Sequence, residues 1–364
     1  MLIGVTLVRM IKAKAIILVA IGFCTILVQA VAFGQTFPDE PTWSLQHGSH
    51  VYSIAFSPSG GTLASGGSDN AIRLWDVQTQ EQIGALQGHT DEVWSVAFSP
   101  KGNILASASL DKTVRLWDVQ TQEQIGLLQG HTDKVLFIDF SPDGKLLASA
   151  SMDTTICLWE VETQKQVGVL EGHDEAVLCV AFSPDERSLA STGWDSMEIL
   201  WDVETQKQVV LISERLNDET VVFSPDGKLL AIGAAWDDDH IRLWDVDKRE
   251  EVGQLGEPVT LGHTNSSFSI AFSPDGEVLA SGGSKDNAIH IWDVHAQEQI
   301  ASLEGHENEV CSVAFSPGGK WLASADHNGI ILLWHVNMPG SPVEPMRRQL
   351  ITWGEVKSCP VCGR

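Results

Sequence analysis

Residues 88–118 read GHTDEVWSVAFSPKGNILASASLDKTVRLWD, and this stretch decides the fold because close copies of it fill most of the chain. Its closing tryptophan recurs in each copy, at positions 75, 117, 159, 201, 244, 292 and 334. The intervals between these tryptophans are 42, 42, 42, 43, 48 and 42 residues. Self-similarity at such a period indicates stacked structural repeats.

Each copy contains four short runs with β-strand character, since apolar and β-branched residues alternate with polar ones. In the second copy these runs are Val93–Phe98, Ile104–Ala108, Val114–Asp118 and Gln124–Leu128. Turn sequences separate them, including the Ser-Pro-Asp-Gly turns at 141–144, 224–227 and 273–276. A small four-stranded sheet cannot bury both of its faces alone, so the copies must stack on one another.

The repeated unit resembles that of the WD-repeat β-propeller family, with Gly-His near its start and Trp-Asp near its end. The resemblance covers residues 41–335 and implies an all-β fold of seven four-stranded antiparallel blades around a central channel. Adjacent units are nearly identical, as in residues 74–84 and the copy that starts at Leu116. In this the chain is similar to exported WD-repeat proteins of bacteria.

The last unit lacks a fourth strand of its own, because Pro339, Pro342 and Pro345 follow its closing Trp334. Residues 42–46 (TWSLQ) occupy the place that residues 84–87 fill one unit later. We therefore expect this N-terminal strand to complete the last blade and close the ring.

The N-terminus has the pattern of a targeting segment. Arg9, Lys12 and Lys14 precede the uncharged residues 15–33, and Ala30-Val31-Ala32 forms a small-x-small triplet. Residues 1–33 are predicted to be either a cleaved signal peptide or a membrane anchor, with lipid modification of Cys24 as a third reading. Residues 34–40 are then a linker. The positive-inside rule places the rest outside the cytoplasmic membrane, as a periplasmic, secreted or tethered protein.

The charge of the chain excludes one large class of partners. It has 48 acidic and 23 basic residues, which gives a formal net charge of −25. Such a body repels phosphate backbones, so we expect no nucleic-acid binding and favour proteins or peptides of basic character.

Each unit contains a His, a Ser and an Asp, the residue types of a hydrolase triad. Enzymes do not build one active site per repeat. The family resemblance instead implies a buried hydrogen-bond network that includes the repeated tryptophan. The network residues in units two, three, four and six are His89, Ser107, Asp111, Trp117; His131, Ser149, Asp153, Trp159; His173, Ser191, Asp195, Trp201; and His263, Ser281, Asp286, Trp292.

Complete networks are expected in those four units only. The first unit has an irregular His47-Gly48-Ser49-His50 start, Ile232 replaces the serine in the fifth, and Asn328 takes the Asp position in the seventh. The fifth blade is therefore expected to be the least stable.

Metal and cofactor sites are not predicted. Asp237-Asp238-Asp239 forms an acidic turn that either binds a cation or is simply solvated. Cys359 and Cys362 stand in a C-terminal tail, residues 336–364, as half of a zinc knuckle without a second ligand pair. A local disulfide, an intermolecular site and a free tail all stay open for this pair. Buried Cys157 and Cys179 are expected to pack in the core.

The family resemblance also implies a ligand face, which carries the Gly-His loops. Three positions in each unit are expected there, and the apolar ones gather on units two to four. An apolar patch rimmed by acids suits protein binding. The partner-binding candidates are Trp94, Glu92, Leu110, Leu136, Met152, Leu178, Trp194 and Tyr52.

These observations favour a non-enzymatic scaffold that presents one propeller face to protein or peptide partners. Two alternatives remain open. The chain could be a structural component of an envelope complex, anchored by its N-terminus. It could also be a propeller enzyme with an active site at the channel mouth, which would need a non-repeating polar cluster there.

Overall fold

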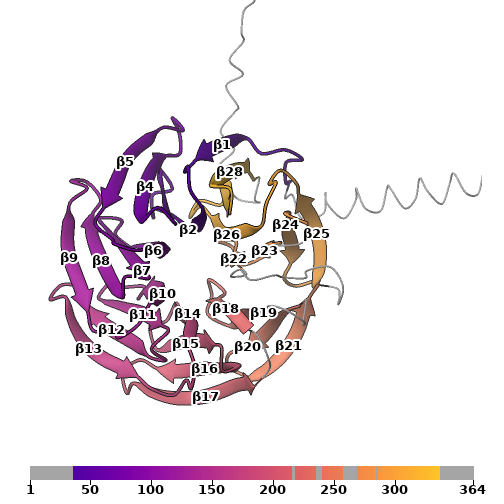
Figure 1. Cartoon of the computed structure of the whole chain (residues 1–364). Helices are drawn as coiled ribbons and strands as arrows, with labels where there is room; N and C mark the ends of the chain where they lie inside the picture. Colours follow the sequence, from indigo (N-terminus) through magenta and orange to yellow (C-terminus); the bar gives the residue numbers. More distant parts are fainter. Residues whose placement is uncertain (1–35, 215–217, 235–239, 257–268, 284–285, 337–364) are drawn as a thin grey trace, which may run out of the picture.

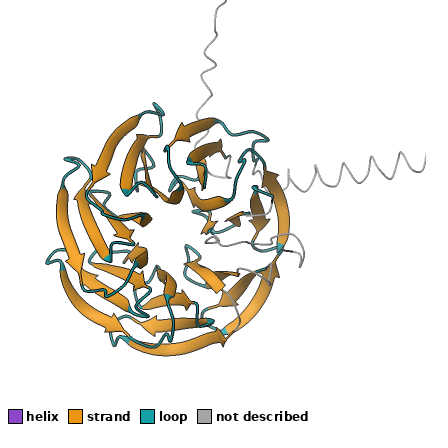
Figure 2. Cartoon of the chain, in the orientation of Figure 1, coloured by secondary structure: helices purple, strands orange, loops and turns teal. Residues whose placement is uncertain are grey.

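The computed structural model describes residues 36–214, 218–234, 240–256, 269–283 and 286–336. Within these residues the 28 regular elements are all β-strands (Figure 1, Figure 2). They form seven four-stranded antiparallel sheets arranged as blades around a central opening, which confirms the predicted fold. No helix in this part of the chain is long and apolar enough to cross a membrane. The predicted targeting segment, the Asp237–Asp239 turn and the Cys359–Cys362 pair lie outside the described residues.

The first four blades follow one another along the chain. Blade 1 contains β2 (Val51–Phe56), β3 (Thr62–Gly67), β4 (Ala71–Asp76) and β5 (Gln82–Gln87). Blade 2 contains β6 (Val93–Phe98), β7 (Ile104–Ser109), β8 (Thr113–Asp118) and β9 (Gln124–Gln129). Blade 3 contains β10 (Val135–Phe140), β11 (Leu146–Ser151), β12 (Ile156–Glu160) and β13 (Lys165–Leu170). Blade 4 contains β14 (Val177–Phe182), β15 (Ser188–Gly193), β16 (Met197–Asp202) and β17 (Lys207–Glu214).

The last three blades complete the ring. Blade 5 contains β18 (Asp218–Phe223), β19 (Leu229–Ala234), β20 (Ile241–Asp245) and β21 (Glu250–Leu255). Blade 6 contains β22 (Ile270–Phe272), β23 (Val278–Gly282), β24 (Ile289–Asp293) and β25 (Glu298–Leu303). Blade 7 combines β26 (Val310–Phe315), β27 (Trp321–Asp326) and β28 (Ile330–His335) with β1 (Trp43–Gln46). In each blade the first strand lies nearest the central opening (Figure 1).

The N-terminal strand closes the ring as predicted. Strand β1 pairs antiparallel with β28, with Trp43 opposite Leu333 and Gln46 opposite Ile330. The indole rings of Trp43 and Trp321 pack with centroids 4.5 Å apart. Leu45 is buried in the cluster that joins blades 7 and 1. Seven intact blades therefore require the two ends of the repeat region to be held together.

The hydrophobic core lies between the blades rather than at the centre of the ring. Trp117 of blade 2, for example, shares one buried cluster with Ile72 and Leu74 of blade 1. Both faces of each sheet are buried in this arrangement, since every blade packs against a neighbour on either side. Side chains also link the inner strands, because the Val96 amide donates to Ser53 Oγ of the preceding blade at 3.1 Å.

The outer rim carries a repeated link that the sequence analysis did not recognise. A glutamine in the last turn of one blade adopts positive φ and donates to a main-chain oxygen of the preceding blade's outermost strand. The donors and acceptors are Gln122 to Ile83, Gln164 to Ile125, Gln206 to Val167 and Gln297 to Val252, at 2.8 to 3.3 Å. In each case a glycine follows the acceptor residue and lies beneath the glutamine side chain.

Candidate partner-binding face

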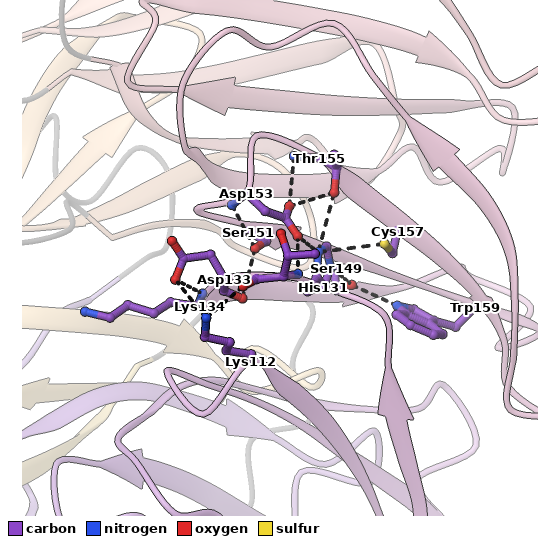
Figure 3. Close-up of polar contacts among 11 residues, drawn as sticks. Lys112, His131, Asp133, Lys134, Ser149, Ser151, Asp153, Thr155, Cys157 and Trp159 are labelled. Atoms are coloured by element: carbon purple, nitrogen blue, oxygen red, sulfur yellow. Dashed lines mark hydrogen bonds and ion pairs between the residues drawn. The ribbon is translucent and has the colours of Figure 1, made fainter.

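Blade 3 shows the buried polar network most completely (Figure 3). His131 Nε2 lies 2.7 Å from Ser149 Oγ, and His131 Nδ1 lies 2.9 Å from Asp153 Oδ2. The indole of Trp159 donates to the same Ser149 Oγ at 2.8 Å. Ser149 is fully buried, with no exposed surface, so a substrate has no access to its hydroxyl. The arrangement crosslinks the strands of the blade, because each polar group satisfies the next in a site from which water is excluded.

Blades 2 and 4 contain the same network. The three contacts are His to Asp, His to Ser and Trp to Ser, and they span 2.8 to 2.9 Å in blade 2 and 2.7 to 3.0 Å in blade 4. The residues are His89, Asp111, Ser107 and Trp117 in blade 2, and His173, Asp195, Ser191 and Trp201 in blade 4.

The electrostatics of blade 2 define the proton positions in the network of that blade. Burial lowers the pKa of His89 in spite of the neighbouring Asp111. Burial acts to raise the pKa of Asp111, but hydrogen bonds from His89 and Thr113 outweigh it and hold that pKa well below its usual range. At neutral pH a neutral imidazole thus donates from Nδ1 to an ionised carboxylate. The hydroxyl of Ser107 then donates to Nε2 while accepting from Trp117.

Blade 7 also has a complete network, and the expectation that it would not was wrong. His306 Nδ1 lies 2.9 Å from Asp326 Oδ2, and His306 Nε2 lies 2.7 Å from Ser324 Oγ. Trp334 donates to that hydroxyl at 2.9 Å. The carboxylate comes from Asp326, two residues before Asn328, because Asp326 ends strand β27 with its side chain directed at the imidazole. Asn328 instead bonds Asn308 at 3.0 Å.

Blade 1 has a modified network in which the histidine is turned over. His47 Nδ1 faces Ser65 Oγ at 2.8 Å, while Arg73 Nη1 donates to His47 Nε2 at 2.7 Å. An arginine always donates, so Nε2 must be unprotonated and Nδ1 carries the proton. Burial first, and the Arg73 charge second, lower the pKa of His47 to about 4. The irregular start of the first repeat therefore still supplies a network histidine, which the sequence analysis did not expect.

Blade 5 departs further from the pattern, and the network of blade 6 is described only in part. In blade 6 the Trp292 indole donates to Ser281 Oγ at 2.9 Å, whereas His263 lies outside the described residues. Asp286 Oδ2 lies 3.0 Å from His290 Nε2. In blade 5, Ile232 fills the serine position opposite Arg242, which forms a buried ion pair with Glu198 of blade 4.

The face that carries these loops brings two predicted surface positions together in each of blades 2, 3 and 4. The amide of Leu110 donates to the Glu92 carbonyl at 3.0 Å, and the equivalent bond joins Trp194 to Ala176 at 2.9 Å. Met152 is bonded to Lys134 in the same way. The turn residue therefore lies beside the residue that leads into the innermost strand, and both sit at the same face of the ring.

The residues of the predicted apolar surface differ in their exposure to solvent. Trp194 is 55% exposed, while Leu110, Met152 and Leu178 are half-buried. Leu136 is only 4% exposed, so it belongs to the packing of blade 3 and not to an open surface. The other large apolar side chains that are well exposed in the described residues lie on the outermost strands. They are Ile83, Ile125, Leu127, Val167, Val169, Val209, Val252 and Ile300.

Tyr52, Trp94 and Glu92 form a separate group at the seam of blades 1 and 2. The rings of Tyr52 and Trp94 stack with centroids 5.2 Å apart. The Trp94 indole donates to Glu92 Oε2 at 3.2 Å. Burial, followed by the Glu92 carboxylate, raises the pKa of Tyr52, so its phenol stays protonated.

Two histidines that were not among the partner-binding candidates extend this group. His50 and His327 stack with ring centroids 5.3 Å apart, and each meets Tyr52 edge-on, at 6.4 and 6.1 Å. His327 comes from the seventh repeat, 275 residues after Tyr52, and only ring closure brings them together. Their positions in the sequence could have identified them, since both stand at face positions of their repeats.

Among the described residues no group of three or more His, Cys, Asp or Glu side chains is arranged to hold a metal ion. The free thiols of Cys157, Cys179 and Cys311 are buried. Burial raises the pKa of Cys179 to about 11 and that of Cys311 well above its usual value, so neither is a reactive thiolate.

The fold and the repeated buried network define a seven-bladed β-propeller with crosslinked blades. The chain belongs to the family described as WD domain, G-beta repeat, whose model matches residues 39–76, 80–118, 122–160, 164–202, 219–245, 256–293 and 297–335. Propellers of this family generally act as non-enzymatic platforms for protein interaction, which supports that general role for this chain.

Curated relatives match the chain over about one repeat. It is 49% identical over 45 residues to the antiviral protein SKI8 of Saccharomyces cerevisiae, and 44% identical over 50 residues to the U3 snoRNP-associated protein-like YAOH of Oryza sativa subsp. japonica. It is 47% identical over 38 residues to the probable serine/threonine-protein kinase PkwA of Thermomonospora curvata. These matches cover 12%, 14% and 10% of this chain, and 11%, 10% and 5% of the respective relatives.

Proposed function

We propose that this chain is a non-enzymatic scaffold that binds proteins or peptides through the face carrying the Gly-His loops. The observation that carries the proposal is the exposure of Trp194. A tryptophan that is 55% exposed, on the face that also carries the half-buried Leu178 and Met152, offers a large apolar contact. Such side chains dominate the binding energy of protein interfaces once a partner removes them from water.

The charge of the chain supports partners of basic character. A formal net charge of −25 attracts cationic surfaces and accelerates their association. The apolar residues of blades 2 to 4 would then provide the contact, and the surrounding carboxylates the selectivity.

The N-terminal pattern supports a site of action outside the cytoplasmic membrane. Residues 15–33 are uncharged and follow three basic residues, as in exported or tethered proteins. The scaffold would then meet its partners in the periplasm, outside the cell or at the outer side of that membrane.

A photocrosslinking experiment tests the proposed face. A benzophenone amino acid replaces Trp194 in one variant and Ile125 in another, because Ile125 is 43% exposed but lies on the outermost strand β9. We expect discrete crosslinked partners from position 194. In a separate affinity capture, the wild type should retain these partners and the Trp194→Ala protein should lose them. Equal crosslinking from both positions would contradict the proposal, as would an unchanged set of partners after Trp194→Ala.

A further inference from the structure

The surface that carries a further inference lies where blades 7, 1 and 2 meet. Six side chains from the equivalent face positions of these blades lie close together there. We call them the aromatic-acidic cluster: Glu309, His327, His50, Tyr52, Glu92 and Trp94. The cluster is non-repeating, since the equivalent positions of blades 3 and 4 hold Lys134, Leu136, Met152, Ala176, Leu178 and Trp194.

The carboxylate of Glu309 is incompletely satisfied. Its Oε2 lies 3.6 Å from His327 Nδ1, and its side chain is 13% exposed. Its Oε1 is buried and has no hydrogen-bond partner among the described residues. Burying a carboxylate oxygen without a donor is costly, so Glu309 gains free energy if its carboxylate turns toward a donor supplied from outside the chain.

The cluster has acceptors and ring faces but contains no lysine or arginine. Glu92 and Glu309 supply two carboxylates, and four rings surround them. Burial, and then the neighbouring His50, lower the pKa of His327 although Glu309 opposes this, so that ring is neutral at pH 7. The cluster is therefore negatively charged, and it combines carboxylates with the electron-rich faces of aromatic rings.

We propose that the aromatic-acidic cluster binds a single cationic side chain of a peptide partner, a guanidinium or an ammonium group. The cation would donate to the carboxylates of Glu309 and Glu92 and lie against the rings of Tyr52 and Trp94, which stabilise it through cation–π attraction. This inference rests on the proposed scaffold function. It adds a second, polar subsite on blades 7, 1 and 2, separate from the apolar contact at Trp194 of blade 4.

Tyr52 provides a direct readout because it is the chain's one tyrosine. Protein labelled with 3-fluorotyrosine should give one ¹⁹F resonance, from the centre of the cluster. The probes are N-acetyl-arginine amide, N-acetyl-lysine amide and the neutral N-acetyl-citrulline amide. We expect the resonance to shift saturably with a cationic probe at pH 7.5, with a Kd lower than that for citrulline amide by about tenfold or more. The tighter of the two cationic probes identifies the group as guanidinium or ammonium.

Matched variants separate the cluster from general charge effects. Glu309→Gln and Glu92→Gln should each weaken binding of the cationic probe by about fivefold or more, since each removes one ionised acceptor. Glu123→Gln makes the same charge change at an exposed outer turn of blade 2 and should leave the Kd unchanged. Unaltered melting temperatures show that the variants are folded. Because two acidic positions are tested, a folding defect in one leaves the other decisive.

The proposal is overturned if neither cationic probe shifts the resonance, if citrulline amide binds equally well, or if both Glu variants bind as the wild type does. These results leave the scaffold proposal intact when position 194 still crosslinks partners. Conversely, a saturable cation effect without crosslinking at position 194 would keep the subsite and refute the apolar contact.

Discussion

Gln164 of blade 3 donates a 2.8 Å hydrogen bond from Nε2 to the main-chain oxygen of Ile125, which lies on the outermost strand of blade 2. Its side chain covers Gly126, where an added Cβ would lie 2.9 Å from the amide group. The boundary between blades 4 and 5 shows the converse, since Val210 of blade 4 takes the glycine position and Arg249 of blade 5 takes the place of the glutamine. The pairing of glutamine with glycine thus follows from contact across the blade boundary.

This contact predicts a coupled effect of two substitutions. Gly126→Ala should destabilise the wild type by about 1 kcal/mol or more, because the new methyl group displaces Gln164 and its hydrogen bond. Gln164→Ala should cost a similar amount alone. The double variant should be destabilised by clearly less than the sum of the two single costs, which urea denaturation would measure. Strict additivity would mean that the two side chains do not interact.

The carboxylate of blade 7 distinguishes two neighbouring positions. Asp326→Asn should lower the free energy of unfolding by about 2–3 kcal/mol, because it removes a charged acceptor from the buried His306 imidazole. Asn328→Ala should cost less than about 0.5 kcal/mol, since Asn328 is exposed. Chemical denaturation of both variants measures the difference. If Asn328→Ala cost more than Asp326→Asn, position 328 would be the network position, as the repeat pattern predicted.

Acid should destabilise the domain through His47. Its pKa in the folded protein is about 4, below its ordinary value of 6.5. The unfolded chain therefore binds a proton first, and the stability that neutral His47 contributes above pH 6.5 is lost as the pH falls toward 4. The loss amounts to about 3 kcal/mol when complete.

The measurement is the free energy of unfolding at pH 7.5, 6, 5 and 4.5. His47→Gln should flatten this profile, whereas His295→Gln, at an imidazole whose side chain is 72% exposed, should leave the slope unchanged. Parallel profiles for the wild type and His47→Gln would show that His47 is protonated equally in both states.

Closure of the ring should control the stability of the whole domain. Replacing residues 41–46 by a Gly-Ser segment of equal length removes the β1–β28 pairing and buried Leu45, and exposes the edge of β28. We expect a fall in melting temperature for the entire domain in calorimetry, because every blade is stabilised by its neighbours. The control is Ser44→Ala, an exposed position on the same strand, which should melt like the wild type. Retention of the wild-type melting temperature by the replaced protein would contradict the role of β1.

Local sequence was sufficient for the blades. Four alternating runs with turns between them predicted each sheet, and the spare strand at residues 42–46 predicted the closure. The pattern failed where the chain could use a neighbouring residue instead. In blade 7, Asp326 bonds the histidine although the repeat pattern had placed the acidic position at Asn328. In blade 1, Arg73 donates to His47 Nε2 and so reverses the ring. Both occur because a buried imidazole accepts any well-placed partner.

The candidate surface was less predictable than the fold. Leu136 and Leu178 occupy the same face position of their repeats, yet Leu136 is buried and Leu178 is half-buried. Exposure depends on which neighbouring side chains cover a position, and those neighbours come from other blades.

The sequence by itself determined the number of blades, their strands and the need for closure, because repeat period, alternation and turn residues act over short distances along the chain. Only the tertiary structure decided which residues meet across blade boundaries. Closing the ring sets His327 beside His50 and Tyr52, and stacking places Gln164 over Gly126. These contacts depend on the rotation of one sheet against the next, which no local pattern specifies.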